Sequence, residues 1–173
     1  MVARMRSWRL EDVVDGRRLR VQLSAAALDG IGDEKATRNR VLELLKGALF
    51  RGRLIGQERL EAGAGGLDTA RLFSAVQDEV IAALYDYTTI HVFRARNPTM
   101  AERLAVCATG GYGRRTLAPS SDVDLLFLRG YRDAPWAESV TEYMLYMLWD
   151  MGLKVGHATR TIDETLREAR NDW

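Results

Sequence analysis

The sequence predicts an α+β fold in which two long helices precede a small mixed sheet. In the first half of the chain, apolar residues recur every three to four positions, which is the spacing of a helix face that packs on a core. After Pro98 the pattern changes to short runs that favour strands, separated by a glycine-rich turn and by one further helix. Strands and helices in that order are typical of a small sheet with helices packed on it.

The composition is that of one folded domain. A chain of 173 residues can bury one ordinary core, and 47% apolar with 28% charged residues is typical of a soluble globular protein. A net charge of +1 provides no basic field for nucleic acid, and no apolar run is long enough to span a membrane. The single cysteine, Cys107, cannot form an internal disulfide, which fits a reducing compartment. We therefore expect a cytoplasmic protein that engages neither nucleic acid nor a membrane.

Residues 1–32 have weak periodicity, and a turn is indicated at residues 13–16. We predict that this N-terminal arm is either a mobile segment or a short docked helix.

Residues 33–97 are predicted to form a helical scaffold. The first helix runs from about Asp33 to Ala62, and the acidic residues at its start suit the positive end of the helix dipole. A glycine-rich break at 63–66 follows. Asp68 is then the predicted N-cap of a second helix, which ends at Asn97 because the proline after it removes a donor.

Residues 98–173 are predicted to contain the sheet. Three segments favour strands, and a helix with apolar residues at helical spacing separates the second from the third. Another helical segment with acidic residues in its first turn begins at Ile162. The strands are expected at 103–109, 121–128 and 153–159, and the helix at 135–151.

The run GGYGRRTLAPSSDVDLLFL, from Gly110 to Leu128, contains the clearest functional signal. Side chains alternate along a strand, so Asp122 and Asp124 point to the same face. Two carboxylates at a strand edge are hard oxygen ligands suited to Mg²⁺. Gly110 and Gly111 allow the backbone to approach a phosphate with its N–H groups. A metal site next to a phosphate-binding turn predicts phosphoryl or nucleotidyl transfer.

Each half of this motif also has a purely structural interpretation. An isolated Asp-x-Asp is most often a solvated strand edge, and an isolated Gly-Gly-x-Gly is most often a tight turn. The combination favours a site, because two close carboxylates repel each other unless a cation lies between them. Arg114 is predicted to pair with a phosphate, whereas a solvated surface role explains Arg115 equally well. Ser121 either orients Asp122 or is a turn hydroxyl.

These residues resemble the nucleotidyltransferase signature of the polymerase-β-like superfamily, in the segments 110–114 and 117–126. Within it, the chain is most similar to the N-terminal part of the protein-PII uridylyltransferase family. A second segment supports this resemblance, namely WDMGLKVGH at 149–157 followed by Thr159-Arg160-Thr161. The resemblance implies that residues 98–173 are a nucleotidyltransferase core and that the chain is a fragment of a longer protein.

The resemblance also implies an activity and its site. The enzyme would use UTP and Mg²⁺, transfer UMP to a tyrosine of the PII nitrogen-regulatory protein, and release pyrophosphate. Asp122 and Asp124 would bind the metal. Four further residues would bind the nucleotide: Gly110, Gly111, Arg114 and Ser121. Because no residue identifies the base, an adenylyltransferase or another nucleotidyltransferase of the same fold is the alternative.

Superfamily members usually place a third carboxylate on a later strand. The segment 153–160 contains no acid, and the candidates near it are Asp150, Asp163 and Asp172. A second alternative is therefore a catalytically silent module that binds a nucleotide or a partner protein.

The two histidines are assigned separately. His157 either contacts the nucleotide or is structural, and His91 is expected to be structural. With two histidines and no His-Asp pair, the chain cannot assemble the metal cluster of the family's uridylyl-removing hydrolase, so deuridylylation is not expected of it.

Overall fold

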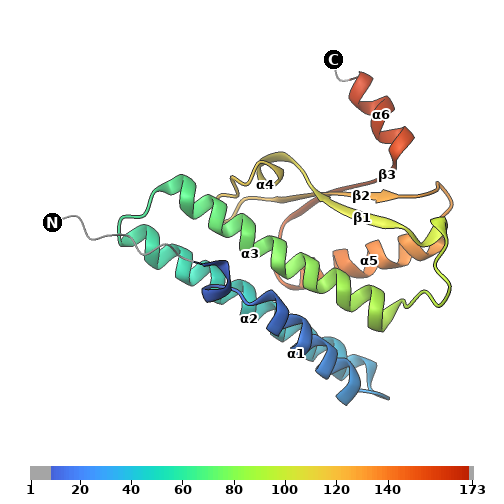
Figure 1. Ribbon diagram of the computed structural model, residues 1–173, viewed down its shortest axis with the longest axis horizontal. Helices are drawn as coiled ribbons and strands as arrows, with labels where there is room; N and C mark the ends of the chain where they lie inside the picture. Colours follow the sequence, from blue (N-terminus) through green and yellow to red (C-terminus); the bar gives the residue numbers. More distant parts are fainter. Residues whose placement is uncertain (1–8, 172–173) are drawn as a thin grey trace.

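A computed structural model describes residues 9–171 and confirms the α+β class (Figure 1). Three short turns of helix accompany the main elements: η1 (Leu10–Asp12), η2 (Thr88–Val92) and η3 (Met100–Glu102). The main elements, in chain order, are α1 (Gly16–Asp29), α2 (Glu34–Glu61), α3 (Gly66–Tyr87), β1 (Leu104–Ala108), α4 (Gly110–Gly113), β2 (Val123–Arg129), α5 (Pro135–Asp150), β3 (Val155–Thr161) and α6 (Ile162–Asn171). None of the helices within residues 9–171 is long and apolar enough to cross a membrane.

The three strands form a mixed sheet, as predicted, and their order in it is β1-β2-β3. β1 and β2 are antiparallel, with Cys107 opposite Leu126, whereas β2 and β3 are parallel, with Leu126 opposite Ala158. A parallel pair needs a long crossover connection, and α5 provides it.

One face of the sheet is buried and the other is more open. Along β2, three apolar side chains are buried (Val123, Leu125 and Phe127), whereas Asp124 and Leu126 between them are half-buried. α3 and α5 lie against the buried face, and α1 and α2 lie beyond α3 (Figure 1). Because side chains alternate along a strand, Asp124 projects from the face that these helices leave uncovered.

Of the two predictions for the N-terminal segment, the docked helix is the one observed: it is α1, and it follows a turn at Val13. The Asp15 side chain accepts a hydrogen bond from the Arg18 N–H (2.8 Å), which makes Asp15 the N-cap of α1. Leu19 and Leu23 are buried, and α1 contacts both α2 and α3. Predictions for residues 1–8 lie outside the described residues.

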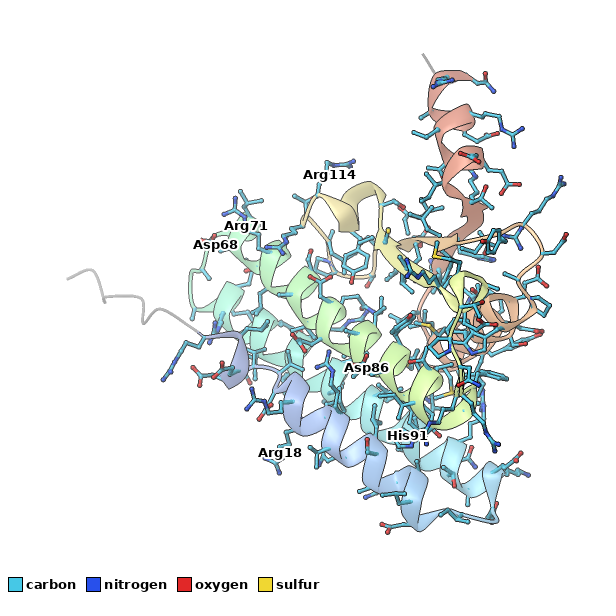
Figure 2. All side chains as sticks on the ribbon, turned by 45° about the vertical axis from the view of Figure 1, so that its right-hand side comes forward. Arg18, Asp68, Arg71, Asp86, His91 and Arg114 are labelled. Carbon is cyan, nitrogen blue, oxygen red and sulfur yellow. The ribbon has the colours of Figure 1, made fainter. Side chains whose placement is uncertain are left out.

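The first scaffold helix begins as predicted. Asp33 is the N-cap of α2, and its side chain accepts from the Ala36 N–H (2.9 Å). The prediction that Asp68 caps the next helix was wrong, because α3 begins at Gly66 with Gly65 as its N-cap. Asp68 instead lies in the first turn, 3.5 Å from Arg71 (Figure 2).

The second scaffold helix ends earlier than Asn97. α3 ends at Tyr87, and η2 continues it only to Val92. Threonine hydroxyls compete for the carbonyls of the last turn: Thr88 donates to the Leu84 carbonyl (2.7 Å) and Thr89 to the Tyr85 carbonyl (3.0 Å). The α-helix thus changes to the wider helical turn η2, and the helical backbone ends at Val92, before the proline is reached.

Candidate active site

The carboxylate of Asp124 lies between two glycines. Asp124 is opposite Gly156 in the parallel pair, where a Cβ would lie 2.5 Å from the Asp124 Oδ1. On the other side, a Cβ at Gly110 would lie 2.4 Å from the Asp124 Oδ2. Gly110 also has a φ of +58°, in the left-handed region that favours glycine. Both neighbours of the carboxylate must therefore be glycine for Asp124 to keep this position.

The glycine-rich turn is tied to the same residue. The Thr109 N–H donates to the Asp124 carbonyl (2.9 Å), and the Gly113 N–H donates back to the Thr109 carbonyl (2.7 Å). Gly110 and Gly111 are the first two residues of α4, and the first N–H groups of a helix have no acceptor within it. The turn thus presents backbone donors close to the Asp124 carboxylate.

The structural need for glycine differs between the positions of this turn. A Cβ at Gly113 would lie 2.6 Å from the Ala108 carbonyl oxygen, so this glycine lets α4 pack on the end of β1. A Cβ at Gly111 would meet only the Thr116 carbonyl oxygen at 4.0 Å. The motif predicted the same role for Gly110 and Gly111, but within this turn the contacts require glycine only at Gly110 and Gly113.

Asp122 lies just before β2 and is exposed. Val123 is buried, and its N–H donates to the Lys154 carbonyl (2.8 Å), so the backbone is already paired with the segment leading to β3. Side chains on either side of a buried strand residue point away from the core. Asp122 precedes β2, so the shared face of Asp122 and Asp124 follows from this alternation and stays a prediction.

Ser121 serves the turn before Asp122. Its hydroxyl and its N–H both donate to the Ala118 carbonyl, at 3.0 and 3.2 Å. Of the two roles considered for Ser121, the turn hydroxyl is the one that the structure contains. Ser120, next to it, has a φ of +64°.

Arg114 follows α4 and is exposed. Its side chain extends from the turn away from the helical layers (Figure 2). No ion pair holds it among residues 9–171, so its guanidinium is accessible to an anion bound at the turn.

Two polar residues of α3 form hydrogen bonds that support the turn, and neither was predicted from the sequence. The buried Tyr112 donates its hydroxyl to the Asp78 Oδ1 (2.7 Å), and the Leu117 N–H donates to the Ser74 Oγ (3.2 Å). Burial, together with the neighbouring Asp78, raises the pKa of Tyr112 far above its ordinary range. Ser74 and Asp78 are four residues apart on a largely apolar helix, and that spacing on one face is the signal that could have identified them.

No third carboxylate joins the pair within the part of the chain that the structure describes. Asp150 forms an ion pair with Arg38 of α2. Asp163 lies in the first turn of α6, at the opposite end of β3 from Gly156. Asp172 is outside the described residues. Accordingly, residues 9–171 contain no group of three or more His, Cys, Asp or Glu side chains placed to hold a metal ion.

His157 does not face Asp124. It is opposite Leu125 in the sheet register, and alternation places its side chain on the face away from Asp124. Its ring packs edge-on against Trp149 of α5, with centroids 6.1 Å apart. His91 is structural, as predicted, because its Nε2 lies 3.0 Å from the Ser24 Oγ.

Sequence comparison finds similar proteins, whereas no family model and no solved structure matches the chain. The relatives are named bifunctional uridylyltransferase/uridylyl-removing enzyme, as the two motifs predicted. The protein from Phenylobacterium zucineum is 66% identical over 173 residues, which is all of this chain and 18% of its own length. The protein from Caulobacter vibrioides is 64% identical over the same span, again 18% of its length. The protein from Bradyrhizobium diazoefficiens is 46% identical over 163 residues. The chain therefore spans less than a fifth of these relatives.

Proposed function

We propose that this chain is the nucleotidyltransferase part of a protein uridylyltransferase that moves UMP from UTP to a tyrosine of the PII protein and releases pyrophosphate. One observation carries the proposal: the Asp124 carboxylate is held between Gly110 and Gly156, beside the first backbone donors of α4. The names of the relatives support uridylyl transfer. The tyrosine acceptor, PII and Mg²⁺ follow from the family resemblance.

The carboxylate oxygens of Asp122 and Asp124 are suitable ligands for Mg²⁺. This ion commonly binds one or two protein carboxylates and completes its shell with water and substrate phosphates. Asp124 is half-buried and its carboxylate lies between Gly110 and Gly156, whereas Asp122 is exposed. When bound there, Mg²⁺ would neutralise the charge that develops on the phosphates during transfer.

The residues of the chain have distinct parts in the transfer. The tyrosine oxygen forms a bond to the α-phosphorus as the bond to the pyrophosphate oxygen breaks, and the phenol proton passes to solvent. Gly110 and Gly111 donate N–H groups to phosphate oxygens, and Arg114 pairs with a phosphate from the outer side of the turn. Asp78 and Ser74 hold the turn in place through Tyr112 and Leu117.

A second candidate is nucleotide binding without turnover. The missing third carboxylate in residues 9–171 favours it, because two-metal transfer needs a group that activates the acceptor hydroxyl. The remaining alternative is an adenylyltransferase or another nucleotidyltransferase of the same fold that acts on a different protein or small molecule.

One experiment separates these functions. The chain is incubated with Mg²⁺, PII and UTP or ATP labelled at the α-phosphate, and nucleotide binding is measured in parallel by calorimetry. Label on PII from UTP supports the proposal, and label from ATP alone supports the adenylyltransferase. Mg²⁺-dependent UTP binding without labelling supports the silent module. Absence of binding to either nucleotide overturns the site itself.

A further inference from the structure

β1 is an outer strand of the sheet, and one of its edges has no strand beside it. Among residues 9–171 the strand order is β1-β2-β3, so β1 pairs only with β2 (Figure 1). An outer strand presents a row of unpaired N–H and C=O groups, which can pair with another extended chain. The free edge of β1 is thus a place where a strand can be added.

The register identifies the β1 residues that face this edge. The Thr109 N–H donates to the Asp124 carbonyl (2.9 Å), and the Gly130 N–H donates to the Arg103 carbonyl (3.3 Å), so the backbone at 103 and 109 is directed toward β2. Backbone direction alternates from residue to residue along an antiparallel strand. The residues whose N–H and C=O groups point to the free edge are therefore Leu104, Val106 and Ala108.

The open part of the edge is centred on Val106. At one end, the Leu104 carbonyl already accepts from the Tyr85 hydroxyl (2.9 Å). At the other end, α4 packs closely on the Ala108 carbonyl oxygen, which would lie 2.6 Å from a Cβ at Gly113. Neither the N–H nor the C=O of Val106 has a hydrogen-bond partner within residues 9–171.

A groove follows this edge between β1 and α3. Its volume is about 360 Å³, and Ile81 and Ala82 of α3 line it together with Val106. Ala105 lines it as well, although alternation places the Ala105 side chain on the other face of the sheet. The strand backbone is therefore part of the wall and can be reached from the groove.

The charged residues along the groove are already paired with one another. Arg20 forms ion pairs with Glu79 (3.0 Å) and Asp86 (2.6 Å), and Asp78 accepts from the Tyr112 hydroxyl. The groove thus has no unpaired charge of its own among the described residues to attract an ionic ligand. Its chemistry suits an apolar side chain carried by an extended backbone.

β1 leads directly to the candidate active site, because Thr109 at its end is bonded to Asp124. Side chains of an added strand alternate between the two faces of the sheet. A residue opposite Val106 enters the groove, and its neighbour opposite Cys107 lies over the open face from which Asp124 projects. The added strand is two strand spacings, about 10 Å, from β2. A tyrosine side chain and a bound phosphate together span a gap of that size.

We propose that the free edge of β1 binds an extended segment of the protein acceptor as an additional strand. The segment's backbone pairs with Val106, one apolar side chain enters the groove, and the acceptor tyrosine next to it lies over the open face. The inference rests on the proposed function and adds to it how the acceptor protein is recognised.

Amide hydrogen exchange, followed by NMR with and without PII, tests this pairing residue by residue. We expect PII to slow exchange about 10-fold or more at the edge-facing N–H groups of Leu104, Val106 and Ala108. Exchange at Ala105 and Cys107 should change little, because their N–H groups already point toward β2. Unchanged exchange at Val106 would overturn the proposal. Slowing that requires no PII and increases with chain concentration would assign the edge to a second copy of the chain, and would overturn it too.

Two variants test the edge and the groove separately. Val106→Pro removes the central donor without removing a bond to β2, as prolines on outer strands do, and Ala82→Arg fills the groove. Each should weaken PII binding about 10-fold in calorimetry and leave UTP affinity within about twofold. Ala70→Arg is the control, because Ala70 is also half-buried on α3 and does not line the groove. Should Val106→Pro fail to fold, Ala82→Arg decides the question.

Failure of this inference can be told apart from failure of the proposed function. If PII is labelled from UTP and Ala82→Arg binds PII as tightly as the wild type, only the added strand is overturned. If PII slows exchange at Val106 but receives no label, the added strand is supported and the transfer reaction is overturned. Absence of PII binding overturns the added strand, whatever the affinity for UTP.

Discussion

The carboxylate of Asp124 occupies the space that a side chain at Gly156 would need. The two residues are direct partners in the parallel β2–β3 pair, and a Cβ on Gly156 would lie 2.5 Å from the Asp124 Oδ1. The presence of glycine on β3 therefore determines where the Asp124 carboxylate on β2 can point.

Replacing Gly156 with alanine should displace the Asp124 carboxylate. A shift of about 1 Å at a catalytic group can cost about 100-fold in rate, so we expect a loss of this order in UMP transfer while the chain stays folded. Rates with labelled UTP and melting temperatures measure the two effects. Gly47→Ala is the control, because its Cβ would meet only the Arg51 side chain at 3.4 Å. Equal rates for both variants would show that the position of Asp124 does not matter.

The carboxylate pair is tested by neutral substitutions. Asp122→Asn and Asp124→Asn each remove a charge from the proposed metal site, and each should reduce transfer by more than about 100-fold at any Mg²⁺ concentration. Asp133→Asn, on an exposed loop after β2, is the matched control. Full activity in both site variants would rule out the metal assignment.

Tyr112→Phe tests the support beneath the turn. Removing the hydroxyl leaves Asp78 without this donor, and we expect unfolding to require about 1 kcal/mol less free energy. Denaturant titration measures this difference. Tyr131→Phe, at an exposed tyrosine, should change the stability little. A Tyr112→Phe variant as stable as Tyr131→Phe would contradict a supporting role for the Tyr112–Asp78 bond.

His157 should be dispensable for nucleotide binding. Its ring packs on Trp149, on the face of the sheet away from Asp124, so His157→Ala should lower stability slightly and leave UTP affinity within about twofold. Calorimetric titration with UTP and Mg²⁺ provides the affinity. A large loss of affinity with an unchanged melting temperature would place His157 in the site after all.

The helical structure of the first turn of α6 should depend on pH. The Glu164 carboxylate accepts from the Thr161 N–H (2.9 Å), and this bond holds the pKa of Glu164 below its ordinary value of 4.5. Because the folded pKa is the lower one, the stabilisation is complete above pH 4.5 and is lost as the pH falls through the folded pKa. Cα chemical shifts of the first α6 turn should therefore move toward coil values in that range.

The matched variants for this effect are Glu164→Gln and Glu168→Gln. The first keeps an oxygen acceptor for the Thr161 N–H but cannot titrate, so its first-turn shifts should stay constant over this pH range. The second changes a charge in the same helix outside the cap and should leave the pH profile as it is in the wild type. If the Cα shifts of the wild type and of Glu164→Gln changed with pH in the same way, the Glu164 cap would not be the cause of the pH dependence.

The local patterns of the sequence were sufficient for the element types and for the carboxylate pair. Helical spacing predicted α2, α3 and α5, and alternation along the run after Ser121 predicted that Asp122 and Asp124 share a face. These features depend on neighbours a few residues away, so periodicity reveals them. The end of α3 was predicted too late, because the helix changes to η2 at Thr88 and ends at Val92, well before the proline that was taken as its end.

Only the tertiary structure decided which residues surround the carboxylate. Gly156 is 32 positions from Asp124 and meets it through the register of a parallel pair, while Tyr112 reaches Asp78 across 34 positions. The same alternation that places Asp124 on the open face turns His157 away from it, which the resemblance to a family segment could not show. The sequence by itself thus determined the chemistry that the motif offers. Strand register and helix packing, which depend on contacts between distant parts of the chain, decided which side chains hold that motif in place.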